Sequence, residues 1–298
     1  MNKTSYIVAG PTASGKSDFA HQLALRIGGV IINCDSVQMY AGIENISASP
    51  FANRALTGDI DGVPYKLFSI LPLAEQISVA DYLELARAEL SAAHAGGHPA
   101  IFVGGTGFYI NALLHGISPI PDISQVNRAR AREIVKNNPQ NAMELLNIEH
   151  TTIHAFDPQR MSRALEVFLE TGRPLAEWQA LPRRGAVAPD AFKILINPHK
   201  EILSVRIAKR IPEMMAGGAM GEAHAVIAAG WEKERAIGAS ELVKFIQGVI
   251  SEKECMQNWE TRTVQYAKRQ RTWFRNQYVA DIEIPHVPTE KDIDNVPA

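Results

Sequence analysis

The stretch at residues 10–17, Gly-Pro-Thr-Ala-Ser-Gly-Lys-Ser, constrains the fold more than any other part of the chain. It matches GxxxxGK[ST], a pattern that needs a strand before it and a helix after it. Here an apolar run precedes it, and Phe19, Leu23 and Ile27 then recur at helical spacing. In such a loop the backbone N–H groups converge on phosphate, the lysine reaches the outer phosphate, and the last hydroxyl can ligate Mg²⁺. The sequence therefore predicts a phosphate- or pyrophosphate-binding loop with Mg²⁺ at Ser17, built from Gly10, Pro11, Thr12, Ala13, Ser14, Gly15, Lys16 and Ser17.

The rest of the pattern is that of an α/β protein. Short β-branched runs at residues 6–10, 29–33, 100–104 and 192–197 are typical of buried strands, and residues 79–95 are typical of an amphipathic helix between strands. This βαβα order predicts a P-loop core with a parallel sheet and helices on both faces.

The alternation stops between residues 116 and 189, where helical patterns at 127–137, 140–146 and 158–171 are bracketed by prolines. An all-helical insertion domain explains this stretch, so we expect a core formed by residues 1–115 and 190–298 and an insertion at 116–189. The segment from residue 201 to residue 278 is also helical in pattern and is expected to pack back on the core.

Composition excludes several classes of protein. The only two cysteines, Cys34 and Cys255, form no CxxC pair, so neither a disulfide framework nor a zinc site is indicated. The sequence contains neither a secretory leader nor an apolar run long enough to span a membrane, so a cytoplasmic protein without membrane contact is expected. The net charge of −2 conceals two basic clusters that are compatible with nucleic-acid binding, namely Arg128, Arg130, Arg132 and Lys136, and Arg262, Lys268, Arg269, Arg271 and Arg275.

Polar residues follow two of the expected strands. Asp35 stands at the carboxyl end of the second strand, where open α/β sheets bind ligands, although the commoner role for such a residue, taken alone, is to cap a helix starting at Ser36. Gln38 could pair with an adenine edge through its amide. Thr106 lies in a glycine-rich turn after the third strand, and a plain turn residue is the alternative there.

The helix expected at residues 158–171 has a polar and an apolar face. Asp157 and Pro158 would begin it, and Met161, Leu165 and Phe168 would face its core. Its polar face carries Gln159, Arg160 and Arg163, for which phosphate contact and a solvated basic face remain equally open.

Five blocks of the sequence resemble those of the bacterial tRNA dimethylallyltransferases. They are the phosphate loop, the Asp-Ser-Val-Gln-Met-Tyr of residues 35–40, the Gly-Gly-Thr-Gly-Phe-Tyr of residues 104–109, the Asp-Pro-Gln-Arg-Met-Ser-Arg-Ala-Leu-Glu-Val of residues 157–167, and residues 266–275. They occur in the order of that family and extend from residue 10 to residue 275.

The resemblance implies transfer of a dimethylallyl group from its pyrophosphate, with Mg²⁺, to N6 of the adenine immediately 3′ of the anticodon. It implies catalytic roles for Asp35 as general base, for Thr106 and for Lys16, and it places Ser36, Val37 and Gln38 around the flipped base. It also implies that the insertion grips the anticodon stem-loop of tRNA, with contacts from Arg128, Gln159, Arg160, Met161, Ser162 and Arg163. A monomer is expected.

Two other classes of protein use the same loop. A small-molecule P-loop kinase would leave the basic clusters without a role, and a non-catalytic P-loop RNA-binding protein would leave Asp35 without one. The kinase hypothesis predicts ATP turnover, whereas the binding-protein hypothesis predicts no turnover.

Overall fold

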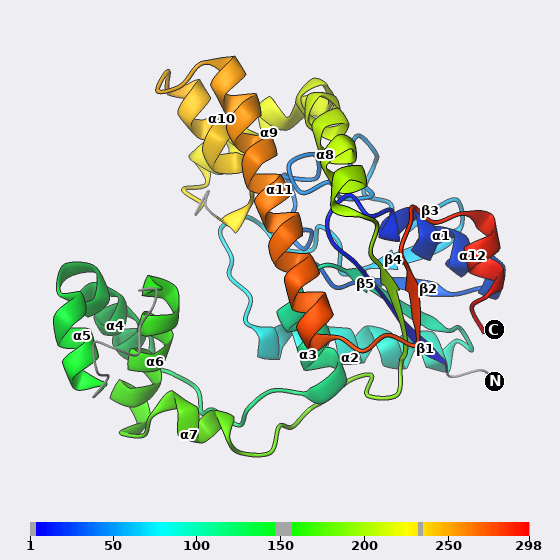
Figure 1. The fold of residues 1–298 in the computed structure, drawn as a ribbon. Coiled ribbons are helices and arrows are strands. Elements are labelled where there is room, and N and C mark those ends of the chain that lie inside the picture. Colours follow the sequence, from blue (N-terminus) through cyan, green and yellow to red (C-terminus); the bar gives the residue numbers. More distant parts are fainter. Residues whose placement is uncertain (1–3, 147–156, 232–234, 298) are drawn as a thin grey trace. The chain divides into compact units, whose positions relative to one another are not determined.

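The chain folds into two compact units, and the computed structural model describes residues 4–146, 157–231 and 235–297 (Figure 1). The first unit comprises Met1–Leu114 and Val187–Ala298, and the second, His115–Ala186, interrupts it in sequence. The insertion predicted at residues 116–189 begins one residue later and ends three residues later than this second unit.

A single sheet forms the centre of the first unit. Among the described residues its order is β3-β4-β2-β5-β1-β6-β7, and every neighbouring pair is parallel except the antiparallel pair of β3 and β4 at one edge. The strands are β1 (Ser5–Ala9), β2 (Val30–Asn33), β3 (Asp59–Ile60), β4 (Val63–Lys66), β5 (Ala100–Gly104), β6 (Phe192–Ile196) and β7 (Ile282–Ile284). The four predicted strands are therefore confirmed as β1, β2, β5 and β6, and they lie side by side in the middle of the sheet.

The first unit surrounds this sheet with helices. They are α1 (Lys16–Ile27), α2 (Val79–Ala95), α3 (Gly107–His115), α8 (Lys200–Met214), α9 (Met220–Ala228), α10 (Ala239–Ile246), α11 (Glu252–Gln277) and α12 (Glu290–Asp294), with a π-helical turn, η2 (Met215–Ala219), between α8 and α9.

Helices cover both faces of the sheet, which is why the central strands are apolar throughout. On one face Tyr6 and Val8 of β1 pack with Phe19 of α1 in one core cluster. Figure 1 shows α2 and α3 on the opposite side of the sheet from α1 and α12. There Tyr82 of α2 stacks on Tyr109 of α3, with 4.0 Å between the ring centroids. The predicted α/β core with helices on both faces is confirmed.

The C-terminal helices form a second core within the first unit. Leu203 and Ile207 of α8, Leu242 of α10 and Trp259 of α11 belong to one buried cluster. The cluster extends to the segment after β2 through Ile43. The predicted packing of this helical segment onto the core is therefore observed, and it brings α8 and α11 to the carboxyl end of the sheet.

The segment after α11, for which the sequence analysis predicted no structure, packs on the rest of the first unit. Strand β7 pairs with β6 at the edge of the sheet, and Arg26 of α1 donates to the carbonyl oxygens of Ile293 and, at 2.6 Å, Val296. The chain end therefore stabilises α1 from outside.

The second unit is helical in its described residues, with α4 (Gln125–Asn137), α5 (Pro139–Leu145), α6 (Pro158–Thr171) and α7 (Leu175–Gln179). Local sequence determines where three of these helices start. The side chains of Ser124, Asn138 and Asp157 cap α4, α5 and α6, and a proline occupies the first turn of α5 and of α6. Residues 147–156 lie outside the described residues.

None of the helices in the described residues is both long enough and apolar enough to span a membrane.

Candidate functional site

The phosphate-binding loop, residues 10–17, joins β1 to α1. Glycine is needed at Gly10, where a Cβ would lie 2.4 Å from the Ile196 carbonyl oxygen, and at Gly15, whose φ is 93°. Helix α1 begins after Gly15 without a side-chain cap. The first N–H groups of α1 therefore lack side-chain acceptors, and the helix dipole favours an anion there.

Lys16 provides a cation in this loop. Its Nζ donates to the Pro11 carbonyl oxygen at 3.3 Å. Burial lowers the pKa of Lys16 to about 8, an effect that Asp35 opposes and Arg210 reinforces. A bound phosphate would favour the protonated form, because an opposite charge at close range raises the pKa of an ammonium group.

Two arginines of α8 also reach the loop, and the sequence did not predict them. Arg206 Nε donates to the Ala13 carbonyl oxygen at 2.8 Å, and an Arg210 guanidinium nitrogen donates to Thr12 Oγ1 at 2.8 Å. Arg210 Nε is buried and has no partner in the described part of the chain. Burial, with Arg206 nearby, lowers the pKa of Arg210 to about 10. An unpaired, buried cationic donor is costly, so an anion at this position would stabilise the site.

Asp35 lies just after β2, at the same edge of the sheet as the phosphate loop. Asn33 fixes its backbone, since Asn33 Oδ1 accepts from the Asp35 N–H at 2.8 Å and Asn33 Nδ2 donates to the Asp35 carbonyl oxygen at 2.9 Å. Asp35 Oδ1 accepts from the Val37 N–H at 3.0 Å. This bond closes a turn rather than beginning a helix, because residues 36–39 form bends and turns. The alternative role of Asp35, as the cap of a helix starting at Ser36, is therefore wrong, and Asp35 Oδ2 is left for a ligand.

The glycine-rich turn after β5 brings Thr106 to the same place. Thr106 Oγ1 accepts from the Ser36 N–H at 3.1 Å, so the ends of β2 and β5 are joined directly at the site. Tyr266 of α11 makes a side-chain hydrogen bond with Thr106, and burial raises its pKa. Tyr266 also lines the cavity.

Gln270 of α11 connects this turn to the phosphate loop. Its Nε2 donates to the Gly105 carbonyl oxygen at 2.8 Å, and its Oε1 accepts from the Thr12 N–H at 2.8 Å. Glycine is needed at residue 105, because a Cβ there would lie 2.4 Å from the Gln270 amide nitrogen. The sequence did not assign this bridge.

Gln38 uses its amide nitrogen within the protein. Its Nε2 donates to the carbonyl oxygens of Ser47 and Ala48, at 3.1 and 3.0 Å. The structure therefore leaves its carbonyl oxygen, but not its N–H groups, for a ligand. Pairing with both a donor and an acceptor of adenine would require Gln38 to give up these hydrogen bonds.

These groups meet in a cavity of about 620 Å³ within the first unit. It brings together the predicted residues Thr12, Ala13, Gly15, Lys16, Ser17, Asp35, Ser36, Val37, Gln38 and Thr106. Helix α8 contributes the cations Arg206, Lys209 and Arg210, and the connection between α9 and α10 contributes Arg235; the sequence analysis placed none of them in the site. The remaining lining has an apolar part, formed by Ile46, Ala48, Ile211, Met214, Ile237 and Trp259, and it also contains the acids Asp18 and Glu213.

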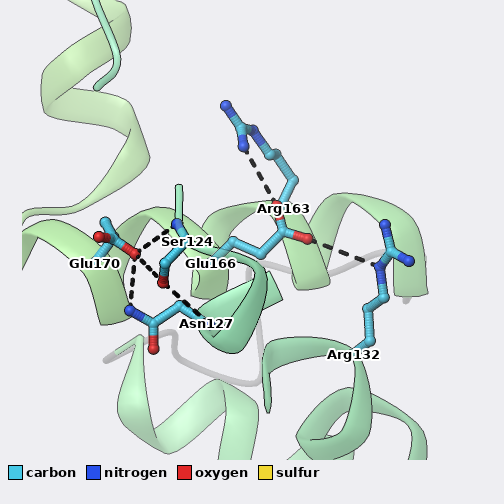
Figure 2. Close-up of polar contacts among 6 residues, drawn as sticks. All are labelled: Ser124, Asn127, Arg132, Arg163, Glu166 and Glu170. Carbon is cyan, nitrogen blue, oxygen red and sulfur yellow. Dashed lines mark hydrogen bonds and ion pairs between the residues drawn. The ribbon is translucent and has the colours of Figure 1, made fainter. Parts of the chain in front are cut away.

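The remaining predicted residues lie in the second unit. Arg160 has an 89 % exposed side chain and forms an ion pair with Asp157, and Gln159 is also exposed. Arg163 is half-exposed and pairs with Glu166 (Figure 2). Ser162 and Arg128 are partly exposed, and Arg128 Nε is buried without a partner in the described region.

Met161 is the exception among these residues. It lies with Ala131, Val135 and Leu165 in the apolar core of the second unit, as the amphipathic pattern of α6 predicted. It can support the RNA-contacting face assigned to this block, but it is not itself on the surface.

Together, the fold and the cavity define a P-loop protein with a strongly cationic anion site next to a carboxylate. Comparison with known proteins places it more narrowly. A family model described as IPP transferase matches residues 38–277, and one described as isopentenyl transferase matches residues 3–58.

Curated relatives and solved structures match over nearly the whole chain. The chain is 39 % identical to the tRNA dimethylallyltransferase of Acidiphilium cryptum, over 94 % of this chain and 86 % of that protein. It is 35 % identical to the tRNA dimethylallyltransferase of Rickettsia bellii, over 96 % and 92 %. The tRNA isopentenylpyrophosphate transferase structure from Bacillus halodurans is 28 % identical with a TM-score of 0.67, over 98 % of this chain and 94 % of that one. This chain belongs to the tRNA dimethylallyltransferases of the IPP transferase family.

Proposed function

We propose that this protein transfers a dimethylallyl group from dimethylallyl pyrophosphate to N6 of the adenine immediately 3′ of a tRNA anticodon. One observation carries the proposal: a single cavity holds a phosphate loop reinforced by two arginines and, beside it, the carboxylate of Asp35. The relatives are named for tRNA prenylation, which supports the substrate class.

The cationic end of the cavity suits the pyrophosphate. Lys16 belongs to the loop, and Arg206 and Arg210 each donate a hydrogen bond to it. Charge on the leaving group grows as its bond to carbon breaks, so fixed cations stabilise the transition state more than the bound substrate. The apolar wall beside them, with Ile46, Ile237 and Trp259, fits the five-carbon group.

Asp35 is the proposed general base. The N6 lone pair attacks C1 of the dimethylallyl group, the C1–O bond breaks, and its electron pair leaves with pyrophosphate. The proton that N6 loses passes to Asp35, whose Oδ1 is already occupied by the Val37 N–H and whose Oδ2 can accept it. To reach this position the adenine must leave its stack, as bases do for other enzymes that modify them.

Mg²⁺ fits the donor set at the loop. Within the described residues, no cluster of three or more metal-ligating His, Cys, Asp or Glu side chains occurs. Mg²⁺ commonly needs few protein ligands, because phosphate oxygens and water complete its shell. Ser17 in the cavity lining would hold it, and it would neutralise charge on the departing pyrophosphate.

The second unit is proposed to hold the anticodon stem-loop through Arg128 of α4 and Arg160 and Arg163 of α6. Their exposure supports contact with phosphates, which usually supply most of the affinity for nucleic acid. Since tRNA is cytoplasmic, the reaction is proposed to take place in the cytoplasm.

Incubation of the full chain with unmodified tRNA and labelled dimethylallyl pyrophosphate tests the proposal. Label should appear in the RNA and, after digestion, in the adenine 3′ of the anticodon. ATP turnover without label transfer would instead support a small-molecule kinase. Binding of tRNA without any turnover would support a non-catalytic RNA-binding protein.

A further inference from the structure

Two glutamates one turn apart on α6 have different partners (Figure 2). Glu170 Oε2 accepts from the Ser124 N–H at 2.9 Å, the Ser124 hydroxyl at 2.7 Å and Asn127 Nδ2 at 2.8 Å. These bonds fasten α6 to the first turn of α4. Glu166 instead lies between two arginines, with one carboxylate oxygen toward each.

The pairs of Glu166 join two helices. Its Oε1 lies 3.9 Å from Nε of Arg132 on α4, and its Oε2 lies 3.3 Å from a guanidinium nitrogen of Arg163, three residues earlier on α6. The Glu166 side chain is 9 % exposed, whereas those of Arg132 and Arg163 are 58 % and 43 % exposed. The carboxylate is therefore at the base of the arrangement, and both guanidiniums extend from it to the surface.

Stability does not account well for this arrangement. Ion pairs to half-exposed arginines add little to folding, and burying a carboxylate has its own desolvation cost. The two helices are already held together by their apolar core and by Glu170. What Glu166 adds is a negative charge between two cations that would otherwise repel each other, hydrogen-bonded to Arg163 and ion-paired with Arg132 at 3.9 Å.

A guanidinium held in this way keeps donors for a ligand. Each guanidinium has five N–H groups in a fixed plane, and pairing with one carboxylate oxygen leaves most of them for other acceptors. Arginine binds phosphate through two parallel N–H groups, and this geometry depends on how the plane is oriented.

We propose that Glu166 is a positioning residue that holds Arg132 and Arg163 as a paired clamp for adjacent phosphates of the tRNA backbone. This inference rests on the proposed function, since the RNA is its substrate. It adds Arg132, on the neighbouring helix, to the residues that touch RNA, and it gives a buried acid a role in binding an acidic partner.

Replacement of Glu166 by glutamine separates positioning from charge. Glu166→Gln raises the net charge of this surface by one. If only charge mattered, tRNA would bind more tightly. If Glu166 orients the arginines, tRNA binds more weakly despite the added positive charge. The dependence of log K on log salt then becomes shallower by roughly 0.7 to 0.9 for each phosphate that is no longer bound.

The matched control is Glu170→Gln, which removes the same charge one turn away, from a carboxylate that accepts from Ser124 and Asn127 instead. Affinity for unmodified tRNA is measured with the full chain at several salt concentrations, together with kcat and the KM of each substrate. We expect Glu166→Gln alone to raise the KM for tRNA by about 3- to 10-fold, the effect of losing one hydrogen bond of ordinary net strength. Its kcat and its KM for dimethylallyl pyrophosphate should match the parent.

Arg132→Lys is a second test in case Glu166→Gln does not fold. Lysine retains the positive charge but lacks the planar guanidinium that binds phosphate through two N–H groups. It should weaken tRNA binding in the same way. Equal or tighter tRNA binding by Glu166→Gln, or unchanged tRNA affinity in Arg132→Lys, would overturn the inference. The proposed function would still stand in that case if the parent protein transferred label to tRNA. A parent protein that bound no tRNA would contradict the proposed function itself.

Discussion

Asp35 is held by bonds that serve both a turn and a reaction, and one substitution separates the two roles. Asparagine can accept from the Val37 N–H as Asp35 Oδ1 does, at 3.0 Å in the parent, but it cannot take a proton from N6. Asp35→Asn should therefore keep the turn and lower kcat by about 10²- to 10⁴-fold, the usual contribution of a positioned base. Single-turnover label transfer with bound tRNA measures this directly. Near-parental turnover with unchanged tRNA affinity would leave Asp35 only its role in the turn.

Lys16 predicts a pH dependence of donor binding. Its pKa is lowered to about 8, so the charged form is complete at lower pH and is lost as pH rises through 8. Because the pyrophosphate needs the charged form, the KM for dimethylallyl pyrophosphate should rise several-fold between pH 8 and pH 9. Initial rates across this range measure the effect. In Lys16→Ala the KM should be higher throughout and flat over the same range; an inflection that persisted there would assign the titration to another group.

At the residue scale, the sequence predicted the site residues that directly follow strands and missed those contributed by the C-terminal helices α8 and α11. Asp35 and Thr106 were found because the carboxyl ends of parallel strands meet at one edge. Arg206 lies 193 residues beyond its partner in the loop, and Gln270 lies 258 residues beyond its own, so only tertiary packing brings them there. The only local sign of these contacts in the sequence was the four-residue spacing of Arg206 and Arg210, which places both on one face of α8.

At the scale of elements, prediction succeeded where local chemistry determines structure. The bounds predicted for α2 and α6 agree with the structure, because each has a capping residue and a strong period. Strands β3, β4 and β7, with two, four and three residues, were missed because an alternating pattern is hard to recognise in so few positions. Their existence depends on neighbours in the sheet.

Helix α11 is predicted to act on the site through Gln270. Gln270→Ala leaves the Thr12 N–H and the Gly105 carbonyl oxygen without their partner, in a buried position. We expect a loss of about 1–3 kcal/mol in the free energy of unfolding and a higher KM for dimethylallyl pyrophosphate. Chemical denaturation and donor kinetics measure the two effects. Gln265→Ala, at an exposed position of the same helix, is the control and should change neither; equal behaviour of the two variants would contradict the bridge.

At the scale of the whole molecule, the chain divides into two units, and the boundaries lie close to the prolines and the change of pattern near residues 116 and 189. The two units have separate cores, and each core is built from its own described residues. The phosphate loop and Asp35 lie in the first unit, whereas Arg160 and Arg163 lie in the second. The proposed function therefore assigns the two substrates largely to different units.

This division predicts that donor and RNA binding can be impaired independently. Arg163→Ala removes a half-exposed guanidinium from α6, so it should raise the Kd for tRNA and make the salt dependence shallower by roughly 0.7 to 0.9, the change expected when one phosphate is no longer neutralised. Its KM for dimethylallyl pyrophosphate should not change. Lys16→Ala should raise the KM for dimethylallyl pyrophosphate and leave the Kd for tRNA unchanged. Charge at the loop stabilises the departing pyrophosphate and contributes little to the binding of RNA by the second unit. Salt titrations of tRNA binding and donor kinetics on both variants provide the test. If Arg163→Ala kept the parental salt dependence, Arg163 would be a structural partner of Glu166 and would not bind phosphate.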